Sequence, residues 1–133
     1  MTSDNENQWV GVILAAGIGS RMRSSIPKPL HSLCGRTLLG QTMCVLKDAG
    51  VQRLVVVVSP LIAADPAFAE VVGEDAGVAI QTEPRGTGDA LLTASDAVDG
   101  ASQILVANAD MPLVTPKTIR TMLSTHTESG AAI

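Results

Sequence analysis

The sequence predicts an α/β fold with a doubly wound, mainly parallel sheet of Rossmann-like type. Short apolar runs typical of buried strands alternate along the chain with segments that have helical features. Ala, Val, Leu and Ile supply most of the apolar residues, whereas the chain has one Trp, one Phe and no Tyr. Small aliphatic side chains of this kind suit a sheet that is covered by helices. The 133 residues are enough for one small domain with a substantial core.

The strands are predicted from apolar runs that end at turn residues. The strongest is RLVVVVSP, in which four consecutive valines precede a proline turn. The predicted strands are residues 10–15, 53–60, 78–81 and 103–107. The last residues, AAI at 131–133, resemble the beginning of a fifth strand.

Four segments between or after these strands have helical periodicity or capping residues. The predicted helices are residues 37–49, part of 65–74, 87–98 and 115–129. Gly50 is a natural stop for the first helix. Pro66 and Pro116 fall in the first turn, where proline is tolerated, and Thr87 and Thr115 are candidate N-caps. Because strands and helices alternate, right-handed crossovers are expected.

A parallel sheet of this class binds its ligands outside the carboxyl ends of its strands. The loops after Ala15, Gln81 and Ala107 should therefore share one edge of the sheet. We find no internal repeat, low-complexity tract or linker. The expected organisation is a flexible, polar tail at residues 1–9, followed by one domain at residues 10–133.

Charge and composition exclude several classes of protein. A formal net charge of −4 argues against a general nucleic-acid binder and against an anionic-membrane binder. No apolar run approaches the length of about 20 residues that a membrane span needs. The polar N-terminus does not resemble a signal peptide, and Cys34 and Cys44 lack metal-ligand spacing. These observations indicate a cytoplasmic protein with reduced thiols.

The basic residues are concentrated in one part of the chain. No acid occurs between Glu6 and Asp48, and this interval holds five of the nine Lys and Arg residues. Within it, VILAAGIGSRMRSSIPKPL at 12–30 places two glycines and three basic side chains directly after a strand. Backbone amides at such a turn can point at an anion. The pattern indicates a polyphosphate site in which Arg21 offers a planar fork and Lys28 a point charge.

Neither of the two commonest glycine-rich phosphate motifs matches this stretch. Gly17 and Gly19 fit the first two glycines of G-x-G-x-x-G, but Met22 stands at the third position. No G-K-[ST] follows, so the stretch is not a P-loop.

The stretch LAAGIGSRMRSSIPKPL resembles the signature of the sugar-1-phosphate nucleotidyltransferases, L-A-A-G-x-G-x-R-M-x-S-x-x-P-K-x-L. QTEPRGTGDA at 81–90 is similar to the family's Q-x-E-P-x-G-T-G-H-A, and NADMPL at 108–113 is similar to Y-G-D-x-P-L. The branch with the greatest likeness is the uridyltransferase domain of bacterial bifunctional N-acetylglucosamine-1-phosphate uridyltransferases. Asp89 stands where that branch has histidine, and Asn108 and Ala109 replace the usual tyrosine and glycine.

The resemblance implies roles for the matching residues. Arg21 and Lys28 would be catalytic, clamping the triphosphate while pyrophosphate leaves, and Asp110 would hold Mg²⁺, a cation that prefers oxygen ligands. Gln81 would bind uracil, since its amide carries both a donor and an acceptor. The residues that would bind the nucleotide are Leu14, Ala15, Ala16, Gly17, Gly19, Gln81, Gly86, Thr87, Asn108 and Ala109.

The reaction implied by the resemblance is transfer of UMP from UTP to a sugar 1-phosphate, with release of pyrophosphate. N-acetylglucosamine 1-phosphate would be the acceptor and UDP-N-acetylglucosamine, a cell wall precursor, the product. Mg²⁺ and the basic side chains would offset the repulsion between the anionic reactants. Nucleoside triphosphate and sugar 1-phosphate are the expected partners, without nucleic acid or membrane.

Two alternatives remain open at this stage. The resemblance covers only the first part of the family's catalytic domain, so the domain looks truncated and the chain could be a non-catalytic nucleotide-binding remnant. Its last strand would then have an unpaired edge that invites association with another copy. The other alternative is a molybdenum-cofactor-type nucleotidyltransferase, which shares the L-A-A-G start.

Overall fold

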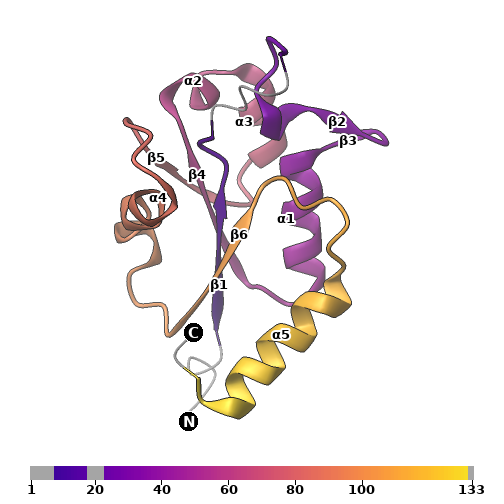
Figure 1. Ribbon diagram of the computed structural model, residues 1–133, viewed down its shortest axis with the longest axis vertical. Helices are drawn as coiled ribbons and strands as arrows, with labels where there is room; N and C mark the ends of the chain where they lie inside the picture. The colour runs from indigo at the N-terminus through magenta and orange to yellow at the C-terminus, as the bar shows by residue number, and fades with distance from the viewer. Residues whose placement is uncertain (1–7, 18–22, 132–133) are drawn as a thin grey trace.

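The computed structural model describes residues 8–17 and 23–131 and has a four-stranded parallel sheet at its centre (Figure 1). The order of the strands across the sheet is β5-β4-β1-β6. Their bounds are Trp9–Leu14 for β1, Arg53–Val58 for β4, Gly77–Ile80 for β5 and Gln103–Asn108 for β6. The expected doubly wound, parallel α/β fold is therefore confirmed.

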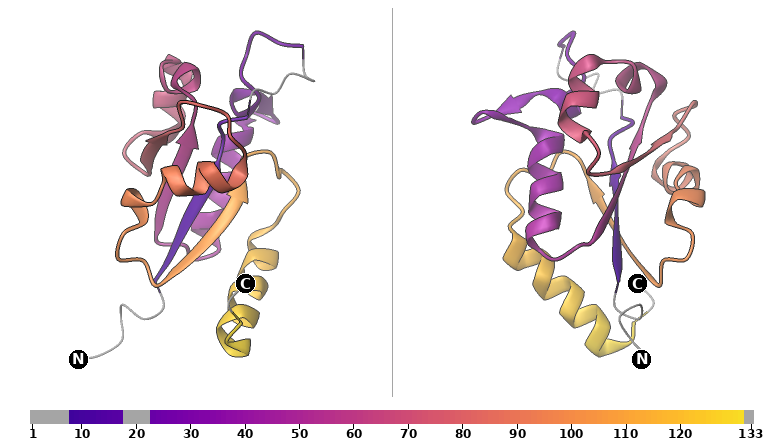
Figure 2. Two further views of the ribbon diagram at one scale, coloured as in Figure 1. Left: turned by 60° about the vertical axis from the view of Figure 1, so that its left-hand side comes forward. Right: turned by 180° about the vertical axis from the view of Figure 1, so that it is seen from behind.

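Helices cover both faces of the sheet. The larger layer consists of α1 (Leu38–Asp48), α3 (Pro66–Val72) and α5 (Pro116–Ser129). The other face carries α4 (Thr87–Thr93), and Figure 2 shows this helix across the sheet from α1. These layers bury the sheet in two separate apolar clusters.

The valine run in β4 reflects burial on both of its faces. Val56 and Val58 pack into the cluster under α1, and Val55 and Val57 pack into the cluster under α4. All four side chains are at most 2% exposed. A strand in this position needs apolar side chains at every position, which is why the run is continuous rather than alternating.

Two of the predicted helix boundaries follow from local capping. The Thr37 hydroxyl accepts a hydrogen bond from the Gly40 amide at the start of α1, and the Thr115 hydroxyl accepts one from the Thr118 amide at the start of α5. Gly50, with a φ of +96°, follows α1 as predicted. The bounds of both helices agree with the predicted ones to within one residue.

The predicted helix at 87–98 is wrong in its extent and in its cap. It consists of α4 and a separate 3-10 turn at Asp96–Val98. At the end of α4, the hydroxyl of Thr93 donates to the Asp89 carbonyl at 2.9 Å. The next turn has the three-residue hydrogen bonds of a 3-10 helix, such as the bond from the Ser95 amide to the Leu92 carbonyl. Gly86, not Thr87, is the N-cap residue, because Thr87 is already the first residue of the helix. The φ of Gly86 is +104°, a conformation that is strained for other residues.

Several short elements were not predicted. A hairpin of β2 (Ser32–Leu33) and β3 (Arg36–Thr37) precedes α1, with positive φ values at the Cys34–Gly35 turn. A 3-10 turn spans Lys28–Leu30, and the short helix α2 spans Pro60–Ala63. None of these elements is long enough to show a period in the sequence.

Both ends of the described chain differ slightly from expectation. The first strand begins at Trp9 rather than at residue 10, and Trp9 is buried. Residues 1–7 of the expected tail lie outside the described residues. Ala131 belongs to no strand, and the other residues of the expected fifth strand, 132–133, are also outside them. In the described part of the chain, none of the helices has both the length and the hydropathy to span a bilayer.

Substitution of Gly11 by Ala tests the closeness of the packing around β1. A Cβ at this position would lie 2.9 Å from Leu54 Cδ2 and 3.2 Å from Leu46 Cδ1, and both leucine side chains are fully buried. We expect Gly11→Ala to lower the free energy of unfolding by about 1–3 kcal/mol, measured by urea denaturation. In the control Gly88→Ala, the new Cβ meets nothing within 4 Å, and stability should stay equal or rise by up to about 1 kcal/mol. Equal stability of the Gly11 variant and the unsubstituted protein would contradict this packing.

Candidate functional site

A cavity of about 470 Å³ lies where the loops after β1, β5 and β6 come together. The 3-10 turn that carries Lys28 forms a further part of its wall. Its lining residues are Leu14, Ala15, Ala16, Gly17, Lys28, Pro29, Gln81, Pro84, Gly86, Thr87, Ala90, Asn108, Ala109 and Asp110. This set includes every candidate residue from the sequence except Gly19 and Arg21, which lie outside the described residues.

Backbone hydrogen bonds fix the loops of the cavity relative to one another. The Ala15 amide donates to the Val57 carbonyl at 2.8 Å, and the Ala109 amide donates to the Leu14 carbonyl at 3.1 Å. The loop after β5 is tied in the same way, since the Gln81 amide donates to the Val58 carbonyl at 2.8 Å. All three loops therefore begin from paired backbone, and their positions are set by the sheet.

Lys28 and Asp110 form an ion pair at the cavity, although 82 residues separate them in sequence. Lys28 Nζ lies 2.7 Å from Asp110 Oδ2. The two side chains are 39% and 43% exposed, so solvent screens their attraction. A pair of this kind contributes between zero and about 1 kcal/mol to stability. Each partner is therefore available to a stronger ligand of opposite charge.

Gln81 is a buried polar side chain in the cavity wall, 6% exposed. Its Nε2 donates to Asp89 Oδ2 at 2.8 Å and to the Gly86 carbonyl at 3.3 Å. Among the described residues, no group donates a hydrogen bond to its Oε1. The amide thus has satisfied donors and an acceptor that is available to a ligand.

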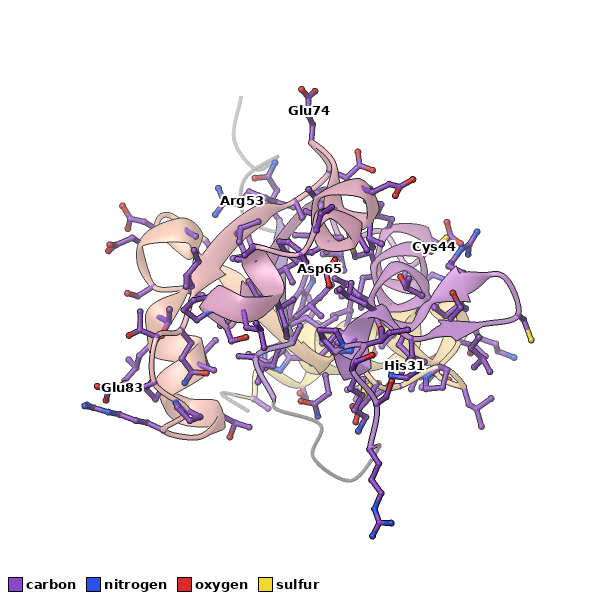
Figure 3. The ribbon with its side chains drawn as sticks, turned by 90° about the horizontal axis from the view of Figure 1, so that it is seen from above. His31, Cys44, Arg53, Asp65, Glu74 and Glu83 are labelled. Atoms are coloured by element: carbon purple, nitrogen blue, oxygen red, sulfur yellow. The ribbon has the colours of Figure 1, made fainter. Side chains whose placement is uncertain are left out.

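Glu83, the acid in the loop after β5, is directed away from the cavity. The Glu83 carboxylate pairs with the Arg85 guanidinium, and Glu83 lies at the outside of the molecule (Figure 3). Neither residue lines the cavity. Among the lining residues, all of which lie in the described part of the chain, Asp110 is the single acid and Lys28 the single base.

The donor set of the cavity suits a hard cation that is bound mainly through its substrate. The described residues contain no group of three His, Cys, Asp or Glu side chains that could hold a metal ion. Mg²⁺ bound with nucleotides commonly takes only one or two carboxylates and completes its shell with phosphate oxygens and water. The Asp110 carboxylate fits this role.

The structure also reveals contributors that sequence reasoning missed. Pro29, Pro84 and Ala90 complete the cavity wall. Thr42, a buried polar residue of α1, donates from its hydroxyl to the Leu38 carbonyl, and the same hydroxyl lies 3.3 Å from the Ala109 carbonyl. The sequence gives no signal for this contact, because 67 residues separate Thr42 from the loop that it supports.

Comparison with known proteins agrees with the motifs. Residues 11–133 match the family model described as the MobA-like NTP transferase domain. The chain is 43% identical over 125 residues to the bifunctional protein GlmU of Xanthobacter autotrophicus and 37% identical over 124 residues to that of Streptomyces coelicolor. Each match covers 92% of this chain but only 27% and 26% of the respective relative. The chain thus spans about a quarter of the length of these curated relatives.

Solved structures with the same fold include those of two different proteins. Rv0371c from Mycobacterium tuberculosis H37Rv aligns with a TM-score of 0.72 at 30% identity, over 91% of this chain and 62% of that protein. A further structure of Rv0371C is a complex with manganese, with a TM-score of 0.69 and 25% identity over 91% of this chain and 60% of that one.

The second protein is a nucleotidyl transferase from Methanothermobacter thermautotroptrophicus. Its structure aligns with a TM-score of 0.70 at 29% identity, over 89% of this chain and 57% of that protein. The resemblance inferred from the three motifs is thereby confirmed. With a family model that matches nearly its whole length, the chain belongs to the MobA-like NTP transferase domain family and is related to the uridyltransferase domain of GlmU.

Proposed function

We propose that this chain carries the nucleotide-binding part of a uridyltransferase, which transfers UMP from UTP to N-acetylglucosamine 1-phosphate and releases pyrophosphate. The main support is the cavity itself, where a buried amide, glycine-containing backbone and a Lys–Asp ion pair come together. The likeness to bifunctional GlmU proteins favours this substrate pair. The product would be UDP-N-acetylglucosamine, a cell wall precursor.

The proposed chemistry needs charge neutralisation and alignment rather than a covalent intermediate. An oxygen of the sugar phosphate attacks the α-phosphorus of UTP, and the bond between that phosphorus and the bridging oxygen to the β-phosphate breaks. The electron pair leaves with pyrophosphate. No general base is needed, because a phosphate monoester has a second pKa near ~6 and is largely ionised at neutral pH. Lys28 would donate hydrogen bonds to the phosphate oxygens, and Arg21 remains a predicted second contact.

Asp110 is the proposed ligand for a divalent cation that enters with the triphosphate. Such a cation supplies positive charge to the phosphate oxygens, and the manganese complex of Rv0371C supports divalent-metal binding in this fold. Asp110 pairs with Lys28 through Oδ2, so a cation bound at that oxygen would take the place of the lysine. Lys28 would then turn to the phosphates, so that one weak ion pair is replaced by two stronger ones.

An assay of pyrophosphate release tests the proposed function. We expect UTP and N-acetylglucosamine 1-phosphate to give pyrophosphate in the presence of Mg²⁺, and calorimetry to show binding of UTP. Binding of UTP without turnover would favour the non-catalytic alternative for this chain. A preference for CTP or GTP over UTP would favour the molybdenum-cofactor type. Absence of binding by any of these nucleotides would overturn all three assignments.

Replacement of Lys28 by Met removes the ammonium group while it keeps most of the side-chain volume. A hydrogen bond to a charged group contributes about 1.5–3 kcal/mol, so the affinity for UTP with Mg²⁺ should fall about 10- to 100-fold. Isothermal titration calorimetry measures this change. Lys47→Met is a matched control, because Lys47 is also 39% exposed and pairs with Asp75 at 2.9 Å, outside this cavity. Equal losses in both variants would show that Lys28 has no specific role.

Asp110→Asn keeps the shape of the side chain but removes its charge. We expect the gain in UTP affinity that Mg²⁺ produces to be smaller in this variant by about tenfold or more, because the cation loses its carboxylate ligand. The measurement is a series of UTP titrations at increasing Mg²⁺. Asp75→Asn, which breaks the ion pair with Lys47, should leave the series unchanged. An unaltered Mg²⁺ dependence in the Asp110 variant would exclude this residue as the metal ligand.

A further inference from the structure

We propose that Asp89 is a positioning residue that fixes the amide of Gln81 so that the site distinguishes uracil from cytosine. This inference rests on the proposed function, because it assumes that the cavity holds the base of a pyrimidine nucleotide. Neither the motifs nor the resemblance assigns a role to Asp89, which stands where the similar motif has histidine.

The orientation of the Gln81 amide follows from its two partners. Asp89 Oδ2 and the Gly86 carbonyl oxygen both lie within hydrogen-bond distance of Nε2, at 2.8 and 3.3 Å. A carboxylate and a carbonyl accept hydrogen bonds and cannot donate them. Rotation of the amide by 180° would therefore lose both bonds and bring Oε1 against two oxygens. The bond to the carboxylate is charge-assisted and is the stronger of the two.

Asp89 is itself held by its place in the fold. It lies in the first turn of α4, where a negative charge is favourable because the helix dipole is positive there. One residue further on, Ala90 is 4% exposed, and Ala94 at the end of the helix is fully buried against the sheet. The helix that carries Asp89 thus packs against the valines of β1 and β4.

A fixed amide presents only its acceptor to the base. The Oε1 atom of Gln81 has no donor among the described residues, and the side chain lines the cavity. Uracil carries a hydrogen on N3 and can donate to this oxygen. Cytosine has a lone pair on N3, so that two acceptors would face each other. Without Asp89 the amide could turn more easily and donate to cytosine, and the discrimination would decrease.

The test compares UTP and CTP, each with Mg²⁺, in calorimetric titrations of the intact chain and of two variants. The two bases have the same ring size, so the size of the cavity does not separate them. We expect the unsubstituted protein to prefer UTP by about tenfold or more, and Asp89→Ala to reduce this ratio by about tenfold. Asp89→Asn should keep the ratio within about threefold, because its Oδ1 can still accept from Gln81.

The ratio of the two affinities is measured within a single protein sample. A partly unfolded variant lowers the binding of both nucleotides equally, so the ratio reports on the site rather than on stability. An unchanged ratio in Asp89→Ala, or equal affinities in the unsubstituted protein, would overturn the role of Asp89. The proposed function would still stand if the unsubstituted protein binds UTP and releases pyrophosphate from it. Failure of the unsubstituted protein to bind either nucleotide would overturn both.

Discussion

The site depends on the pairing of β1 with a parallel strand on each side. Leu14, near the end of β1, is in register with Val57 of β4 and with Asn108 of β6. The loops after β1 and β6 therefore leave the sheet at the same level, and β5 reaches this edge through β4, where Ile80 is in register with Val58. Ile13 and Val12 are fully buried on opposite faces of β1 and belong to different core clusters. A shift of the strand register by one residue would turn each side chain toward the other cluster. The register that forms the core is thus also the register that assembles the cavity.

Much of the fold could be predicted because its main elements have strong local signals. The valine run of β4, the threonines that begin α1 and α5 and Gly50 are all patterns that can be recognised within a few residues of the sequence. The hairpin of β2 and β3 escaped prediction because each of its strands has two residues, which is too short for alternation to appear. After α4 the backbone hydrogen bonds change from four-residue to three-residue spacing, and composition does not reveal that change.

The candidate site could be predicted to the level of residue identity but not of contacts. Motifs in the loops after three strands, two of which contain glycine, indicated which side chains would gather at the cavity. The ion pair of Lys28 with Asp110 joins residues that are remote in sequence, and the pairing of β1 with β6 brings the two loops that carry them together. The bond from Gln81 to Asp89 spans only eight residues, but it requires the positive φ of Gly86 to bring the helix back toward the strand. These contacts are consequences of tertiary geometry rather than of local pattern.

The two polar pairs of the cavity differ in a way that fits the proposed reaction. The base of the nucleotide is chemically the same before and after UMP transfer, so its recognition gains from a rigid partner such as the buried Gln81 amide, held by two bonds. The phosphates, in contrast, change their bonds and charges during the reaction. Lys28 and Asp110 are about two-fifths exposed and only weakly paired, so each can exchange its partner at little cost. Burial and exposure within one cavity would thus separate the fixed part of nucleotide recognition from the part that must adapt.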